Sequence, residues 1–155
     1  MSTIAAGTTS GTALVSTGNT DGTLVFQVNG TTTAVTLDTA KSMNLSGSYT
    51  EGVVAIGTVT TSHTFTLANG TVQTATLTAS TACTFTMPTA TAGKSFIVLL
   101  KQAASTGNGT ATFTSVKWGA AGAPTITATA GKMDILSFVS DGTNWYGSIQ
   151  QGYTP

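Results

Sequence analysis

Charged side chains are scarce in this chain of 155 residues, which has five lysines, five acidic residues, no arginine and a net charge of zero. Nucleic-acid binding depends on clustered cations that neutralise phosphates, and the sequence contains no such cluster. No apolar run approaches the roughly 20 residues that span a bilayer, and the first ten residues lack the basic and apolar stretches of a secretory signal. We therefore expect neither nucleic-acid binding nor membrane insertion.

Residues that perform catalysis or bind metals are equally few. His63 is the only histidine and Cys83 the only cysteine, so a single chain has neither an intrachain disulfide nor a His/Cys zinc set. The acids are scattered along the sequence, and no Gly-x-Ser-x-Gly or phosphate-loop motif occurs. We expect a non-enzymatic protein without cofactor or metal, in which Cys83 is a buried core thiol. Three alternatives stay open: Cys83 could be an intermolecular or reactive thiol, three copies of His63 around a trimer axis could bind an ion, and distant acids could form a hydrolase pair within one chain or across subunits.

Threonine and glycine are abundant, at 36 and 18 residues. Threonine is β-branched and favours strands, glycine favours turns, and the usual helix formers are rare, so the composition predicts an all-β protein. A surface of hydroxyls and methyls with few charges keeps little repulsion between copies. This composition suits packing among identical subunits.

The first part of the chain, residues 1–52, has few large apolar side chains and a weak repeat of eleven residues. A unit that starts at Gly7 aligns with one that starts at Gly18, and a looser copy follows at Asn29. Each unit predicts a glycine turn and a short strand that cannot bury its apolar side alone. We interpret this part as an extended Gly/Thr-rich arm whose order depends on neighbouring chains. An ordinary pair of hairpins in a monomer is the alternative.

The second part, residues 53–155, alternates more regularly between apolar and polar side chains. The dipeptides Asn69-Gly70, Asn108-Gly109 and Asp141-Gly142 predict type I′ turns, whose two central residues both need positive φ. Many short strands at about ten-residue spacing predict an antiparallel β-sandwich or jelly-roll-like domain. The predicted strands are Val53–Val59, His63–Leu67, Val72–Leu77, Cys83–Met87, Phe96–Lys101, Thr110–Val116, Thr125–Ala128, Asp134–Val139 and Trp145–Ile149.

One strand differs from the others because Ser95–Leu100 is apolar on both faces. Such a strand is expected either in the doubly buried centre of a sheet or at a subunit interface. The predicted core side chains are Phe96, Val98, Leu100, Ile135, Leu136, Phe138 and Trp145.

Four aromatic residues are the candidate contacts for a ligand or partner: Trp118, Trp145, Tyr146 and Tyr153. Sugar recognition uses aromatic faces with polar neighbours, and Trp118 precedes the Gly- and Ala-rich segment 119–124, where partial exposure is expected. The alternative is that Trp118 and Trp145 cover the edge of the core.

The C-terminal stretch resembles the end of many phage tail-fibre and related virion proteins. Trp118-Gly119, the segment 123–138 and Asp141–Gly147 carry this resemblance, and the last includes an Asp-Gly-Thr-x-Trp ending. Residues 22–37 resemble the Gly/Thr-rich segments of phage fibres. The resemblance implies a homotrimer at the virion surface, whose N-terminal arm docks on the major capsid protein or a tail component and whose C-terminal part faces outward. It implies no catalytic residue.

Together these features predict a non-enzymatic virion structural protein. With 155 residues the chain fits a head decoration protein, a head fibre or a short tail fibre better than a long tail fibre. The alternative function is a receptor-binding module that recognises a host surface glycan, and it requires an exposed aromatic cleft.

Overall fold

The computed structural model describes residues 22–28 and 32–155, and every regular element in these ranges is a β-strand. The all-β prediction is confirmed. The chain divides into two compact units between Thr50 and Glu51. The copy of the eleven-residue repeat that starts at Gly7 lies outside the described residues.

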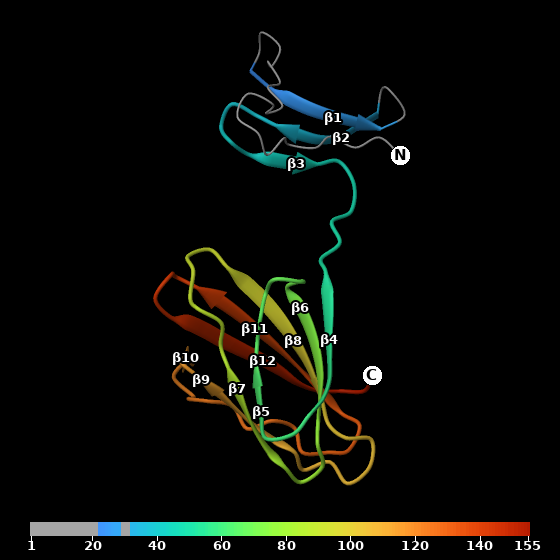
Figure 1. The fold of residues 1–155 in the computed structure, drawn as a ribbon, viewed down its shortest axis with the longest axis vertical. Helices are drawn as coiled ribbons and strands as arrows, with labels where there is room; N and C mark the ends of the chain where they lie inside the picture. The colour runs from blue at the N-terminus through green and yellow to red at the C-terminus, as the bar shows by residue number, and fades with distance from the viewer. Residues whose placement is uncertain (1–21, 29–31) are drawn as a thin grey trace, which may run out of the picture. The chain divides into compact units, whose positions relative to one another are not determined.

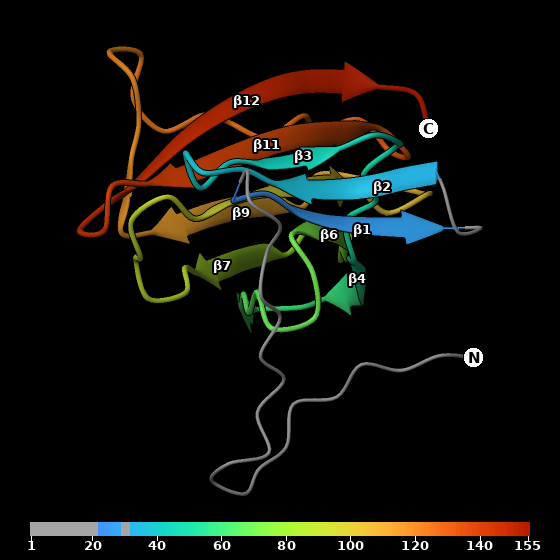
Figure 2. The same cartoon turned by 90° about the horizontal axis from the view of Figure 1, so that it is seen from above.

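The N-terminal unit contains a three-stranded antiparallel sheet, in the order β1 (Leu24–Val28), β2 (Thr32–Leu37), β3 (Met43–Leu45). Figure 2 shows these three strands side by side. The turn between β2 and β3 is held by the Ser42 backbone N–H, which donates to a carboxylate oxygen of Asp38 at 2.8 Å. None of the side chains described in this unit is fully buried, so its described residues form no core.

The second unit holds two sheets (Figure 1). The larger has six strands in the order β10-β12-β11-β8-β6-β4, and the smaller has three in the order β5-β7-β9. The strands are β4 (Val53–Val59), β5 (Ser62–Thr64), β6 (Val72–Leu77), β7 (Ala82–Thr86), β8 (Ser95–Lys101), β9 (Thr110–Thr114), β10 (Val116–Lys117), β11 (Met133–Ser140) and β12 (Trp145–Tyr153).

The strand pairing differs from the predicted antiparallel arrangement. From β4 to β9 the chain alternates between the two sheets, and β4, β6 and β8 pair in parallel, as do β5, β7 and β9. Within the described residues of the second unit, β11 pairs antiparallel with β8 and β12, and β10 pairs in parallel with β12. The path resembles the turns of a β-solenoid, so the prediction of an antiparallel β-sandwich or jelly-roll is wrong. After each strand, the chain crosses to the opposite sheet, forms a strand there and then returns. Consecutive strands of one sheet therefore run in the same direction.

The core lies between the two sheets. Phe65 and Phe96 have ring centroids 5.4 Å apart, and Phe113 and Phe138 approach to 5.5 Å, which joins the two sheets. Of the predicted core side chains only Ile135 is not fully buried. The fully buried apolar side chains include Phe65, Leu77, Cys83, Phe85, Phe96, Val98, Leu100, Leu136, Phe138 and Trp145.

The predicted type I′ turns are not found. Gly70 and Gly142 have positive φ but the residue before each does not, and at the third site Asn108 has positive φ whereas Gly109 does not. Only Asp141-Gly142 joins antiparallel neighbours, between β11 and β12. The other two dipeptides lie in connections between the sheets, where the twist of a two-stranded hairpin is not required.

The predicted strand Thr125–Ala128 is also absent, because buried side chains take the place of a β-ladder there. The Thr127 backbone N–H donates to a carboxylate oxygen of Asp134 at 2.7 Å, and the Thr127 carbonyl accepts from the amide of Gln102 at 2.7 Å. Gln102 and Asp134 are both buried. The segment is therefore fixed to the sheet without joining it.

Candidate functional site

Trp145, the first residue of β12, is a core residue. Its side chain is 2% exposed, its ring meets that of Phe96 edge-on at 5.2 Å, and its indole N–H donates to the carbonyl oxygen of Pro88 at 2.8 Å. The indole face is therefore covered by protein, and its one polar atom already has a partner.

Trp118 is half-buried and packs against the edge of the same core. Its ring lies 5.9 Å from that of Phe113 and 6.0 Å from that of Phe138. A Cβ added at Gly147 would lie 2.6 Å from the Trp118 ring, so the indole covers the inward side of β12 at this glycine. Because side chains alternate along a strand, the neighbouring Tyr146 points to the opposite face.

Tyr146 is the best exposed of the four candidate aromatics, at 45%. Its hydroxyl donates to a carboxylate oxygen of Asp141 at 2.9 Å. The Asp141 carboxylate also accepts from the backbone N–H groups of Asn144 and Thr143, and these hydrogen bonds lower the pKa of Asp141 to about 2. Donation to Asp141 raises the pKa of the Tyr146 phenol.

Tyr153 lies at the other end of β12, where it is 40% exposed and its hydroxyl donates to Gln150 at 2.7 Å. It pairs with Met133 at the start of β11, whereas Trp145 pairs with Ser140 at the end of that strand. The structure therefore does not bring the four aromatic residues onto one surface.

The two residues with reactive side chains belong to the smaller sheet. Cys83 is buried, and burial raises the pKa of its thiol. His63 lies edge-on to Phe65 and Phe85, and burial lowers the pKa of its imidazole. Within residues 22–28 and 32–155, no group of three His, Cys, Asp or Glu side chains is placed to hold a metal ion.

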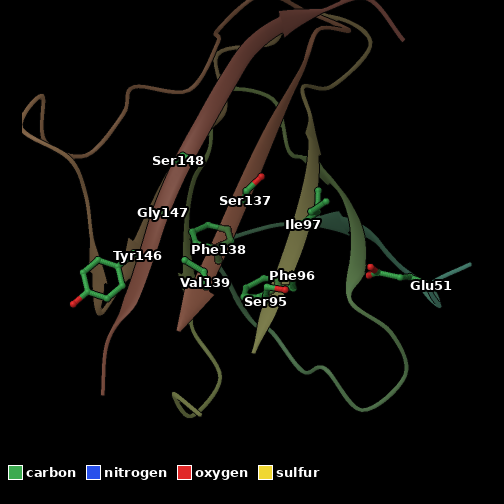
Figure 3. A pocket seen from close by; sticks show the side chains of 10 residues that line it. All are labelled: Glu51, Ser95, Phe96, Ile97, Ser137, Phe138, Val139, Tyr146, Gly147 and Ser148. Atoms are coloured by element: carbon green, nitrogen blue, oxygen red, sulfur yellow. The ribbon is translucent and has the colours of Figure 1, made fainter. Parts of the chain in front are cut away.

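A groove of about 420 Å³ lies on the outer face of the six-stranded sheet. Figure 3 shows the Tyr146 ring and the Glu51 carboxylate at the two ends of its lining, with side chains of β8 and β11 between them. The Thr71 hydroxyl donates to Glu51. The lining residues are Glu51, Ser95, Phe96, Ile97, Ser137, Phe138, Val139, Tyr146, Gly147 and Ser148.

A second, shallower hollow of about 210 Å³ continues along the same face. Its lining includes Leu99 and Lys101 of β8 and Met133 of β11, whose side chains point to the same side of the sheet as Ile97. Of this face, Tyr146 and Tyr153, which pairs with Met133, were among the predicted contact residues. The signal that could have indicated the rest was the run Ser95–Leu100, which is apolar on both faces and was expected at a sheet centre or an interface.

No known protein family, curated protein or solved structure matches this chain. In the part of the chain that the structure describes, no helix has the length and apolar character to cross a membrane. Function is therefore inferred from the residues and the fold themselves.

Proposed function

We propose that this chain is a non-enzymatic structural subunit of a bacteriophage particle, a homotrimeric head decoration, head fibre or short tail-fibre protein at the virion surface. The N-terminal unit docks on the major capsid protein or a tail component.

The observation that carries this proposal is the N-terminal unit, whose described residues form a regular sheet in which no side chain is fully buried. Phe26, Met43 and Tyr49 expose 45%, 63% and 68% of their surface, although a sheet of this size needs a packed apolar face to be stable. Neighbouring chains or a docking partner would supply the missing layer. A soluble monomeric enzyme would gain nothing from such a unit.

The Asp-Gly-Thr-x-Trp ending supports a structural role for the residues that carry the phage-fibre resemblance. Asp141 accepts the backbone N–H groups that close the turn, and Trp145 enters the core. Asp141 and Trp145 thus both stabilise the fold, which agrees with a structural rather than a catalytic role for this motif.

A glycan-binding function is the second candidate from the sequence, but the geometry favours it less. Trp145 is buried, Trp118 packs against core phenylalanines, and only Tyr146 borders the groove. A single exposed aromatic ring offers one stacking platform in a groove whose lining is mostly apolar or hydroxyl-bearing.

Purified particles of the phage that encodes this chain provide the test. We expect the protein in the particles in copies that are a multiple of three, with density for its second unit projecting from the head or tail. The purified chain should sediment with the mass of three copies of 15.5 kDa. A chain that is absent from intact particles would overturn the proposal.

A further inference from the structure

We infer that the outer face of the six-stranded sheet is the surface on which copies of this chain pack against one another. This inference rests on the proposed homotrimer and adds the surface that builds it. We call this surface the outer face, and its apolar and aromatic members are Val53, Val72, Ile97, Leu99, Met133, Ile135, Val139, Tyr146 and Tyr153.

The outer face carries apolar side chains on five strands of the sheet, with hydroxyl-bearing side chains between them: Thr74, Thr76, Ser95, Ser137 and Ser148. Val53 on β4, Ile97 on β8 and Val139 on β11 expose 62%, 39% and 52% of their surface, and their neighbours on the same face are only half-buried. Val53 pairs with Val72, which pairs with Ile97, so these side chains form a row across the strands. Apolar patches of this extent on a soluble protein mark interaction surfaces.

The outer side of the smaller sheet provides an internal comparison. Its outward side chains are mainly hydroxyl-bearing: Ser62, Thr64, Thr84, Thr86, Thr110 and Thr112. The same chain therefore keeps the smaller sheet polar on its outer side, whereas the six-stranded sheet has large apolar side chains among the polar ones. This asymmetry is expected if only the six-stranded sheet meets a partner.

The dimensions of the outer face suit association between proteins. Strands spaced about 4.8 Å apart, with about 3.3 Å per residue, give the five strands of about seven residues an area of about 550 Å². Each partner in a stable interface contributes about 800 Å², so the outer face supplies about two thirds of that area.

The two charges beside the grooves favour a second copy of this chain as the occupant. Glu51 lines the groove near Ser95, where β8 begins, and Lys101 lines the second hollow at the end of β8. In a head-to-tail ring, the start of the strands in one subunit meets their end in the next. Glu51 of one copy then lies beside Lys101 of its neighbour, and the face is complementary in charge to itself.

Three copies also fit geometrically. Strands of seven residues are about 23 Å long. If the strands of three subunits form the sides of a triangle around the axis, each sheet lies about 7 Å from the axis. One layer of side chains needs about 5 Å, half of the usual spacing between packed sheets. The apolar side chains of the outer face would fill this space.

The test measures whether the outer face is covered in the purified full-length chain. Val139→Cys places a thiol on the outer face, and Thr84→Cys places the matched control on the polar face of the smaller sheet. Cys83 is buried, so the wild-type chain provides a low background. We expect a polar maleimide to label Val139→Cys about tenfold or more slowly than Thr84→Cys, because thiol reactivity follows exposure. Ile97→Cys should show the same protection.

Sedimentation of the same samples distinguishes a wrong choice of interface from a wrong oligomeric state. A trimer in which Val139→Cys and Thr84→Cys react equally would overturn the outer face and leave the homotrimer intact. A monomeric wild-type chain would overturn both. A further outcome is that Val139→Cys and Thr84→Cys react equally until a host-envelope glycan preparation is added, after which only Val139→Cys reacts more slowly. In that case a glycan, and not a second copy of the chain, occupies the outer face.

Discussion

The indole N–H of Trp145 donates to the carbonyl oxygen of Pro88, a residue 57 positions earlier in the chain, at 2.8 Å. This hydrogen bond joins the start of β12 to the segment that follows β7, and so links the last strand of the larger sheet to the smaller sheet. The Trp145 ring also fills the space beside Phe96. Trp145 is therefore expected to act through stability rather than through ligand contact.

Trp145→Phe should keep most of the packing and lose the hydrogen bond to Pro88, at a cost of about 1–2 kcal/mol in the free energy of unfolding. Trp145→Ala should cost about 3–5 kcal/mol because it also leaves a cavity. Urea unfolding of both variants measures the two values. A loss below about 1 kcal/mol for Trp145→Ala would contradict the core position.

Asp134 should be the most sensitive acidic residue. Its two carboxylate oxygens accept the backbone N–H groups of Thr127 and Gly152, at 2.7 and 3.0 Å. Asp134→Ala leaves both donors without this partner and should lower the free energy of unfolding by about 2–4 kcal/mol. Hydrogen exchange should become faster at Thr127 and Gly152 before other backbone amides. Asp134→Asn, which keeps one acceptor oxygen, should protect only one of the two.

Gly147 should not accept a larger side chain while Trp118 is present. The Cβ of Gly147→Ala would lie 2.6 Å from the Trp118 ring and 2.9 Å from Val116, so we expect a loss of about 1–3 kcal/mol from overpacking. In a double-mutant cycle, Gly147→Ala should cost less in a Trp118→Leu background, because the smaller side chain leaves room. Equal costs in the two backgrounds would show that the ring is not the obstacle.

Asp141 should make stability depend on pH in the acidic range. Its pKa is about 2 in the folded chain, below the ordinary 3.8, so its contribution is present above pH 3.8 and is lost as the pH falls through about 2. The difference in unfolding free energy between the wild type and Asp141→Asn should shrink over that window. Thermal unfolding at successive pH values measures it, and a difference that grows toward pH 2 would contradict the assignment.

The same substitution tests the hydrogen bond from Tyr146. Because donation to Asp141 raises the pKa of the Tyr146 phenol, Asp141→Asn should lower that pKa toward its ordinary value of 10.0. Ultraviolet titration of phenolate absorbance reports the change, and subtraction of the Tyr146→Phe titration isolates this residue. An unchanged titration would place the Tyr146 hydroxyl elsewhere.

The sequence predicted the parts of this fold that depend on local chemistry. Threonine, glycine and alternating apolar residues specify strands and turns within a few positions, and β4 and β6 match their predicted bounds, Val53–Val59 and Val72–Leu77. Phe96, Val98 and Leu100 were predicted core residues because alternation places them on one face, and all three are buried. These features need no knowledge of which strand pairs with which.

The tertiary structure alone decided the direction of pairing and the course of the irregular segments. Alternation has a period of two residues in parallel and antiparallel strands alike, so Thr74-Ala75-Thr76-Leu77 does not distinguish between them. Nor does a sequence pattern show that Gln102 and Asp134 hold residue Thr127 outside the sheet. Such contacts join residues that are distant along the chain.

The candidate surface shows the same division. The run Ser95–Leu100 predicts a strand with two apolar faces, because Phe96, Val98 and Leu100 alternate with Ile97 and Leu99. Only the tertiary structure decided that Phe96, Val98 and Leu100 face the core whereas Ile97 and Leu99 face outward. The physical reason is that a sheet with a second sheet on one side buries one of its faces and leaves the other to a partner or to solvent.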